Sequence, residues 1–314
     1  MRIYGQIHLG GTGEMHLWKD SLGQEFLYKP AVKKGTMEQE PFRAEIQVAA
    51  SKLQEIISPD TTVACELVEN DGLKGTIQPK IKIDNEKTES LRRYYMGEGV
   101  LDEKIARQFM REYVVDYCLI NYDSHYRNFI VDEKGNLRGV DKEQSFRYIN
   151  DIEVKNDLKF NRYHPNARYG EQPPIYGKIF DDISAGKLSP QILEEVKIGI
   201  ERLRKIPRGE YIDIFTPYAE ALGYKDDKLA TFYDRIMNRV DSLEKVEKMI
   251  EEMQQPKTSL KQLSRRLLDI NVEELARKNP YIQKLKNKKS QDENLQDENL
   301  QKMKGKREGD YEKR

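Results

Sequence analysis

Residues 121–129 read NYDSHYRNF, and residues 139–146 read GVDKEQSF. Asp123 and Asn128 lie in a loop that leaves a predicted helix, and Asp141 follows a predicted short strand. Phosphoryl transfer needs a carboxylate that orients the attacking hydroxyl and oxygen ligands that hold magnesium against the phosphates. A short hairpin between Asn128 and Asp141 would fold the third side chain back beside the second. Each residue taken alone favours an ordinary turn, because Asp and Asn are common in turns.

The first fifty residues supply three further features that phosphoryl transfer requires. These are a flexible glycine-rich turn, a lysine on a later strand, and an acidic side chain on a helix that holds the lysine. They occur in this order as Gly10, Gly11, Thr12 and Gly13, then Lys29, then Glu45. Glu38 and Glu40 are alternatives to Glu45. A glycine cluster or a strand lysine is common by itself, but the ordered set is much less expected by chance.

Hydrophobic patterning predicts a small sheet with one helix in residues 1–83. Apolar residues alternate from Arg2 to Val32 and predict three strands joined by short turns. The apolar stripe from Met37 to Ile57 has helical spacing. Residues 62–67 and 75–83 predict two more strands around a turn at residues 70–72.

The rest of the chain is predicted to be mainly helical. Residues 84–98 are a charged stretch, and residues 147–187 are expected to be mostly irregular. Two short strands, 129–131 and 137–140, are predicted to flank a turn at residues 134–136. The predicted helical segments are 103–121, 189–254 with one helix over 228–253, and 260–275. Residues 284–314 hold too few large apolar side chains to order themselves and predict a solvated tail.

Both quoted segments resemble loops of atypical kinases related to the phosphatidylinositol 3- and 4-kinases and to HipA-type protein kinases. In those kinases an Asp-x-His-x-x-Asn motif replaces the His-Arg-Asp loop, and the matching positions here are Asn121, Asp123, His125, Asn128 and Phe129. Residues 139–141 resemble the metal-binding motif that replaces Asp-Phe-Gly, and residues 75–78 resemble a Gly-Ser-x-Gln motif near the adenine-binding hinge. The resemblance covers roughly residues 1–150, and only residues 121–146 are specific. The chain departs from the pattern at Lys142 and Glu143, where a glycine is expected.

This resemblance implies an α+β, bilobal protein-kinase-like fold with ATP and Mg²⁺ bound between the lobes. The N-lobe would span residues 1–83, the helical C-lobe residues 84–255, and a helical extension with a charged tail residues 256–314. The implied roles are Asp123 as catalytic base, Asn128 and Asp141 as magnesium ligands, Lys29 as phosphate contact, Glu45 as the residue that positions Lys29, Gln78 near adenine, and the glycine-rich turn over the nucleotide. His125 belongs to the catalytic loop, where hydrogen-bonded support is favoured over direct proton transfer.

Composition limits the partners. The 54 basic and 54 acidic residues cancel, which gives no general attraction to nucleic acid. No apolar run approaches the 18 residues needed to cross a bilayer. The apolar surroundings of Cys65 and Cys118, without a charged-then-apolar leader, predict a reducing, cytoplasmic setting.

The acceptor is less constrained by the sequence. Residues 147–187 interleave basic and tyrosine side chains that could grip an anionic lipid headgroup or an acidic protein surface, or simply tie the loop to the helical lobe. Because no membrane-binding helix is evident, we favour a protein Ser or Thr, including the chain itself at Thr12 or Ser21. A phosphoinositide or other small-molecule kinase remains an alternative, as does a non-catalytic nucleotide-binding or partner-docking module.

Overall fold

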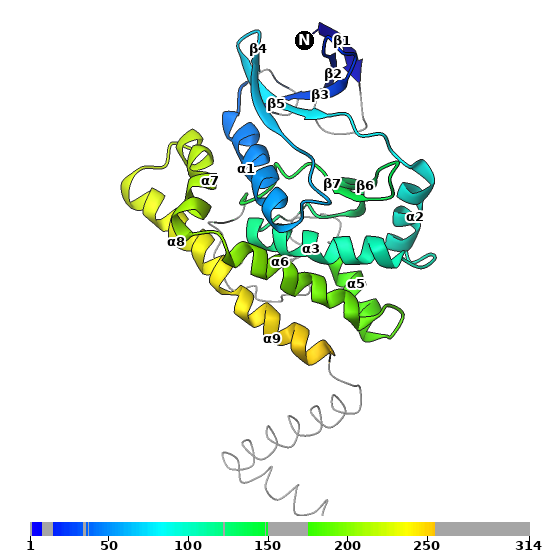
Figure 1. Ribbon diagram of the computed structural model, residues 1–314. Helices are drawn as coiled ribbons and strands as arrows, with labels where there is room; N and C mark the ends of the chain where they lie inside the picture. The colour runs from blue at the N-terminus through cyan, green and yellow to red at the C-terminus, as the bar shows by residue number, and fades with distance from the viewer. Residues whose placement is uncertain are drawn as a thin grey trace, which may run out of the picture. The chain divides into compact units, whose positions relative to one another are not determined.

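The fold is α+β, with a small antiparallel sheet in the first part of the chain and mostly helices in the rest, as predicted (Figure 1). The computed structural model describes residues 2–7, 15–33, 36, 38–121, 123–147, 149 and 175–254. The predicted helix at 260–275, the charged tail and the glycine-rich turn at 10–13 lie outside these residues.

Five strands form the sheet in the order β1-β2-β3-β5-β4. They are β1 (Arg2–Ile7), β2 (Met15–Lys19), β3 (Glu25–Pro30), β4 (Glu66–Asn70) and β5 (Leu73–Pro79). The predicted three-strand meander is confirmed. The β4–β5 hairpin turns at Asp71 and Gly72, whose φ angles are 50° and 75°. Strand β4 therefore ends, and strand β5 begins, closer to the turn than predicted.

One helix from the first part of the chain packs against β5 and against helices of the second part. This is α1 (Pro41–Ile57), which contacts β5, α3, α6 and α7. It begins at Pro41 rather than at Met37, because a proline is well suited to the first turn of a helix, where its missing N–H is not needed. Helix α1 therefore connects the sheet with the helical half.

The second part of the chain is mainly helical. Its helices are α2 (Asn85–Tyr95), α3 (Glu103–Leu119), α5 (Ile175–Ser184), α6 (Glu194–Arg204), α7 (Arg208–Ala221), α8 (Asp226–Asp241) and α9 (Leu243–Gln254), with short 3₁₀ turns η1 (Tyr126–Asn128) and η3 (Pro190–Leu193). A two-stranded sheet, β6 (Phe129–Val131) and β7 (Leu137–Gly139), completes it. No helix in the described part of the chain has the length and apolarity that a membrane crossing requires.

One helix prediction needs correction, and two helices form where none was predicted. The charged stretch after residue 84 contains α2, whose first turn is capped by the Asp84 carboxylate accepting from the Lys87 N–H. Part of the segment expected to be irregular forms α5. The single helix predicted over residues 228–253 is two helices, α8 and α9, separated at Ser242, whose hydroxyl donates to the Arg239 carbonyl.

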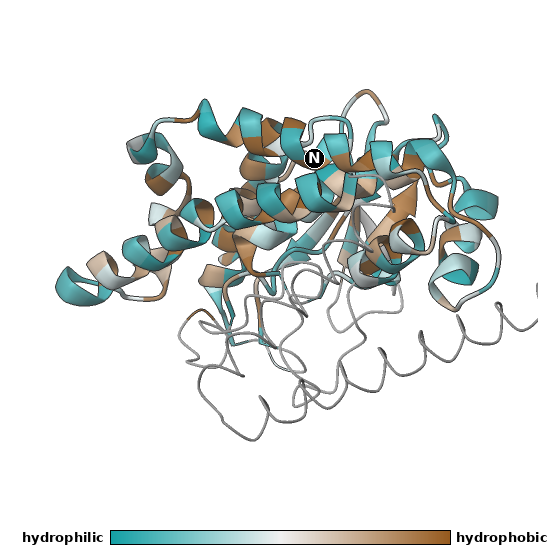
Figure 2. Cartoon of the chain, turned by 90° about the horizontal axis from the view of Figure 1, so that it is seen from below, coloured by the Kyte–Doolittle hydropathy of each residue, from teal (hydrophilic) through white to brown (hydrophobic). Residues whose placement is uncertain are grey.

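The main apolar core lies between α1, α3 and the later helices. At its centre the ring of Tyr176 from α5 makes edge-to-face contacts with Phe109 and Tyr113 of α3. Helices in Figure 2 carry brown apolar and teal hydrophilic stretches side by side, as amphipathic helices do. Cys65 and Cys118 are buried and unpaired, and burial raises the thiol pKa of each to about 12, so neither is a reactive thiolate.

Candidate active site

The loop after α3 is fixed to the end of that helix by Asn121. Ile120 ends α3 in the left-handed region at φ 48°, which turns the chain sharply. The buried Asn121 amide nitrogen then donates to Asp116 Oδ1 over 2.9 Å, and its amide oxygen accepts from the Asp123 N–H over 3.2 Å. Asn121 thus links a buried carboxylate of α3 to the backbone of Asp123.

Both carboxylate oxygens of Asp123 have a donor. His125 Nε2 lies 3.1 Å from Oδ1, and the Asn128 amide nitrogen donates to Oδ2 over 3.0 Å. His125 Nδ1 accepts from the Arg127 N–H over 3.1 Å, so the hydrogen-bond network assigns the ring proton to Nε2. This arrangement suits the supporting role expected for His125, because the ring holds the carboxylate of Asp123 in place.

Asn128 and Asp141 flank the β6–β7 hairpin, one before β6 and the other just after β7. Phe129 pairs with Gly139, and the Val140 N–H donates to the Asn128 carbonyl over 2.9 Å. The predicted hairpin is therefore confirmed, with β7 ending at residue 139. Asp141 follows in the left-handed region at φ 54° and stays partly exposed.

The donor set at this hairpin fits a magnesium ion held with phosphates. The Asn128 amide nitrogen is occupied by Asp123, while its amide oxygen has no partner among the described residues. No cluster of three or more His, Cys, Asp or Glu side chains able to hold a metal occurs in the described part of the chain. Magnesium needs no such cluster, because it commonly takes one or two protein oxygens together with substrate phosphates and water.

Lys29 of β3 lies next to the segment after β7. Its Nζ is 3.0 Å from Asp141 Oδ1 and 3.0 Å from Glu143 Oε2. Burial lowers the pKa of Lys29, but the charges of Asp141 and Glu143 outweigh burial and raise it, so the ammonium stays charged. Lys29 and Asp141, both predicted as site residues, are in direct contact.

The predicted ion pair between Glu45 and Lys29, which both lie in the described part of the chain, does not form. Burial raises the pKa of the Glu45 carboxyl, and the charged groups that act on it are on Lys74, Lys52 and Glu220. Nor do the alternatives reach Lys29, since Glu38 pairs with Lys33 and Glu40 with Arg43. The acidic side chain found beside Lys29, besides Asp141, is Glu143.

Gln78 lies on β5 opposite Leu27 of β3 and is partly buried. Its neighbour in the motif, Gly75, has a clear structural reason to be glycine. A Cβ atom there would lie 2.5 Å from the Lys29 carbonyl oxygen and 2.6 Å from the Tyr28 ring. Gly75 therefore allows β5 to pair closely with the part of β3 that carries Lys29.

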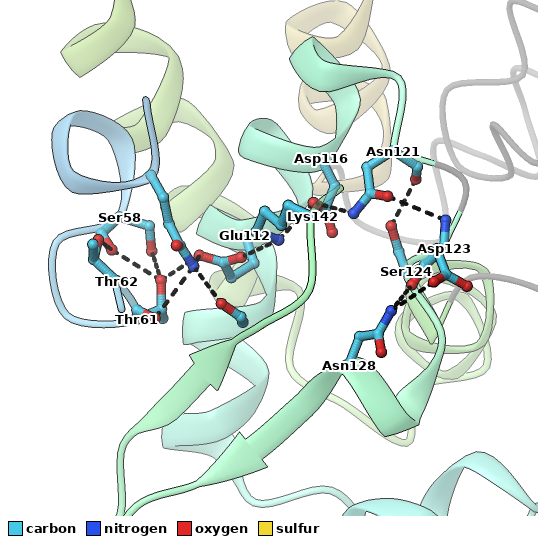
Figure 3. A network of polar contacts seen from close by, with 12 residues as sticks. Ser58, Thr61, Thr62, Glu112, Asp116, Asn121, Asp123, Ser124, Asn128 and Lys142 are labelled. Carbon is cyan, nitrogen blue, oxygen red and sulfur yellow. Dashed lines mark hydrogen bonds and ion pairs between the residues drawn. The ribbon is translucent and has the colours of Figure 1, made fainter. Parts of the chain in front are cut away.

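A buried polar network connects α1 with the loop that carries Asp123 (Figure 3). At its centre Lys142 Nζ lies 2.7 Å from Asp116 Oδ1 and 3.0 Å from Glu112 Oε2, and all three side chains are buried. Burial lowers the pKa of Lys142, but the charges of Asp116 and Glu112 outweigh burial and raise it. The charged ammonium is therefore held between two carboxylates inside the protein.

Neutral donors complete this network. Gln54 Nε2 donates to Glu112 Oε1 over 2.9 Å, and the Tyr176 hydroxyl donates to Asp116 Oδ2 over 2.6 Å. The Thr61 hydroxyl also donates to Glu112. Such donors are required because an unsatisfied buried carboxylate is strongly destabilising.

The residues missed by sequence reasoning are Glu112, Asp116 and Lys142 of the buried cluster, and Glu143 beside Lys29. Glu112 and Asp116 stand four apart on the apolar face of α3, and such a pair needs a buried cation. Lys142 and Glu143 were noticed only as departures from a glycine pattern. In the structure the Lys142 side chain contacts Glu112 and Asp116 of α3, whereas the Glu143 side chain contacts Lys29 and Arg43.

The sequence matches no family model and no curated protein. Among solved structures, the chain is similar to the crystal structure of a Helicobacter pylori proinflammatory kinase, CtkA, with a TM-score of 0.46 and 10% sequence identity. The superposition covers 81% of this chain and 94% of that chain. A similarity at this level carries no conclusion about function, which has to be argued from the geometry described above.

Proposed function

We propose that this protein is an ATP- and Mg²⁺-dependent phosphotransferase that moves the γ-phosphate to a hydroxyl group. One arrangement carries the proposal. Lys29 lies 3.0 Å from Asp141, which follows the β6–β7 hairpin, and Asn128, which precedes that hairpin, donates to Asp123. In the proposal residues 1–83 form an N-lobe over the nucleotide, and residues 84–255 form a C-lobe with the catalytic loop. A lysine, two oxygen ligands and an oriented carboxylate are the parts that phosphoryl transfer requires.

Asp123 is the proposed base. Because His125 and Asn128 each donate to one of its oxygens, the carboxylate is held in one orientation before a substrate arrives. An acceptor hydroxyl that donates to Asp123 would pass its proton there as its oxygen bonds to the γ-phosphorus, while the bond from that phosphorus to the β-phosphate oxygen breaks and ADP leaves. His125, with its Nδ1 occupied by a backbone N–H, acts by orienting Asp123.

Lys29 is the proposed contact to the α- and β-phosphates. Its ammonium is charged and lies at the edge of the metal-ligand hairpin. Asn128 and Asp141 would hold Mg²⁺, which when bound neutralises charge on the phosphates. Gln78 stays the proposed adenine contact.

The proposed acceptor is a Ser or Thr hydroxyl of a protein, and the chain itself offers a candidate. Ser21 lies in the exposed turn between β2 and β3. Exposed turns are accessible to a second molecule, so phosphorylation between two copies needs no rearrangement of the sheet. A lipid or other small-molecule acceptor would appear in the test as label outside the protein.

The proposal is tested with ATP labelled at the γ-phosphate and Mg²⁺, following label on the protein and label released as phosphate. We expect Asp141→Asn to abolish both, because an amide binds magnesium more weakly than a carboxylate. Asp71→Asn is the matched control, since Asp71 also has positive φ but lies in the β4–β5 turn. Turnover by Asp141→Asn equal to that of the unchanged protein would refute the proposal.

A further inference from the structure

Glu143 lies beside Lys29, where the sequence predicted a glutamate of α1. Its Oε2 lies 3.0 Å from Lys29 Nζ, and its Oε1 lies 3.4 Å from Arg43 Nη1. Both carboxylate oxygens therefore face a cation, one from β3 and one from α1. With only 12% of its side chain exposed, Glu143 is more enclosed than the other partner of Lys29, Asp141.

The rotation of α1 explains why Glu45 does not reach this place. Three side chains of α1 contact the segment after β6: Arg43 contacts Glu143, Gln47 accepts from the Lys142 N–H over 2.7 Å, and Gln54 donates to the Gly139 carbonyl over 3.2 Å. Residues four and eleven positions after Arg43 return to nearly the same face, whereas Glu45, two positions on, lies roughly 200° around the helix. The face of α1 toward the segment after β6 therefore presents a cation and amides.

The residue before Glu143 anchors the same segment to α3. Lys142 is anchored between Glu112 and Asp116 in the core, so the segment cannot shift without exposing a buried charge cluster. Asp141 and Glu143, on either side of Lys142, both reach Lys29. The segment thus presents two carboxylates to Lys29 from a rigid base.

We propose that Glu143 is the residue that positions Lys29 for phosphate binding, and that Arg43 connects α1 to this pair. This inference rests on the proposed function and assigns to residue 143 a role that the sequence assigned to Glu45. When phosphate oxygens and a metal engage Lys29 and Asp141, Glu143 remains as the carboxylate that keeps the lysine directed at the site. In this arrangement the acid that holds the lysine comes from the same segment as the metal ligand Asp141.

The kinetic test compares Glu143→Gln with Glu45→Gln, with ATP and Mg²⁺ as the probe. We expect Glu143→Gln to lower kcat about 10- to 100-fold with a smaller change in KM for ATP, because the lysine keeps its charge but loses its position. Glu143→Asp should recover part of this loss, and Glu45→Gln should stay within about twofold of the unchanged protein. A loss in Glu45→Gln equal to that in Glu143→Gln, or none in Glu143→Gln, would overturn the inference.

A second measurement needs no nucleotide. Lys29→Met, Glu143→Gln and the double variant form a thermal-unfolding cycle, in which coupled residues shift the melting temperature non-additively, by about 1–3 °C. The same cycle with Glu45→Gln should be additive. If the unchanged protein does not turn over ATP, the proposed function fails, while additivity in the first cycle would separately refute the contact between Glu143 and Lys29.

Discussion

Two lysines of this protein each lie between two carboxylates, in different surroundings. Lys142 is enclosed: its side chain is 2% exposed, and those of Glu112 and Asp116 are 0% exposed. A cation in this position has no water to replace its partners, so the three charges are fixed to one another. This cluster behaves as part of the core, although it is made of charges.

The cluster around Lys29 is open. Its side chain is 25% exposed, with Asp141 at 41% and Glu143 at 12%. Water can replace the exposed Asp141 more readily than Glu143, so this cluster stabilises the fold less than the buried one and leaves Asp141 free to exchange Lys29 for a ligand. The difference teaches that burial, rather than residue type, separates a structural ion cluster from one suited to binding.

The largest effect is expected at the enclosed lysine. Lys142→Met should lower the free energy of unfolding by about 3–5 kcal/mol, because it leaves two carboxylates buried without a cation. Urea unfolding of the purified protein measures this. An unchanged midpoint would remove the distinction between the two clusters.

A matched variant separates lost charge balance from lost shape. Adding Glu112→Gln and Asp116→Asn to Lys142→Met removes the uncompensated charges while keeping the side-chain volumes similar. We expect this triple variant to recover at least half of the lost stability. Stability as low as that of Lys142→Met alone would show that packing, and not charge, explains the effect.

At Lys29, the open lysine, we expect a substitution to affect catalysis more than stability. Lys29→Met should change the free energy of unfolding by less than about 1 kcal/mol, as for partly exposed ion pairs. It should lower kcat/KM for ATP by about 10²- to 10³-fold, which corresponds to about 3–4 kcal/mol of transition-state stabilisation. Steady-state turnover and urea unfolding, measured on the same sample, separate the loss of activity from the loss of stability. A variant that unfolds readily would instead place Lys29 with the structural cluster.

A glycine beside the enclosed cluster gives a smaller effect. A Cβ atom at Gly139 would lie 2.5 Å from Glu112 Oε2 and 3.0 Å from Gln54 Nε2, and both side chains are held in the network. Gly139→Ala should therefore destabilise by about 1–2 kcal/mol. Gly209→Ala is the control, because nothing lies within 4 Å of its Cβ position in α7, and alanine should be neutral or stabilising there. Equal melting temperatures for the two variants would contradict a tightly held network.

The smallest effect is expected at Glu45, which belongs to neither cluster. Burial raises the pKa of its carboxyl above the ordinary value of 4.5, so the folded state binds its proton more tightly than the unfolded chain does. The charged form is then unfavourable at neutral pH, and this penalty disappears as the pH falls below 4.5. Glu45→Gln should leave the melting temperature unchanged or slightly raised at pH 7, with no difference near pH 4. A clear loss of stability at pH 7 would reveal a partner for Glu45.

Much of the fold followed from patterns along the chain. The three-strand meander, the β4–β5 turn and the β6–β7 hairpin are local, so alternation and turn residues were enough to predict them. Helix α2 was missed because its sequence is strongly charged and only Leu91 and Tyr94 are buried. Helices α8 and α9 were merged because the apolar spacing continues across Ser242.

The sequence by itself determined the hairpin that Asn128 and Asp141 flank, because alternation and turn residues are local signals. Only the tertiary structure decided which acid faces Lys29 and where the charge of Lys142 goes. Those outcomes depend on the rotation of α1 about its axis and on the packing of α3 against a distant segment. A shift of two positions along a helix moves a side chain to the opposite face of that helix. Non-local packing of this kind leaves no spacing pattern in the chain, so the partners of Glu143 and Lys142 can be identified only in the folded protein.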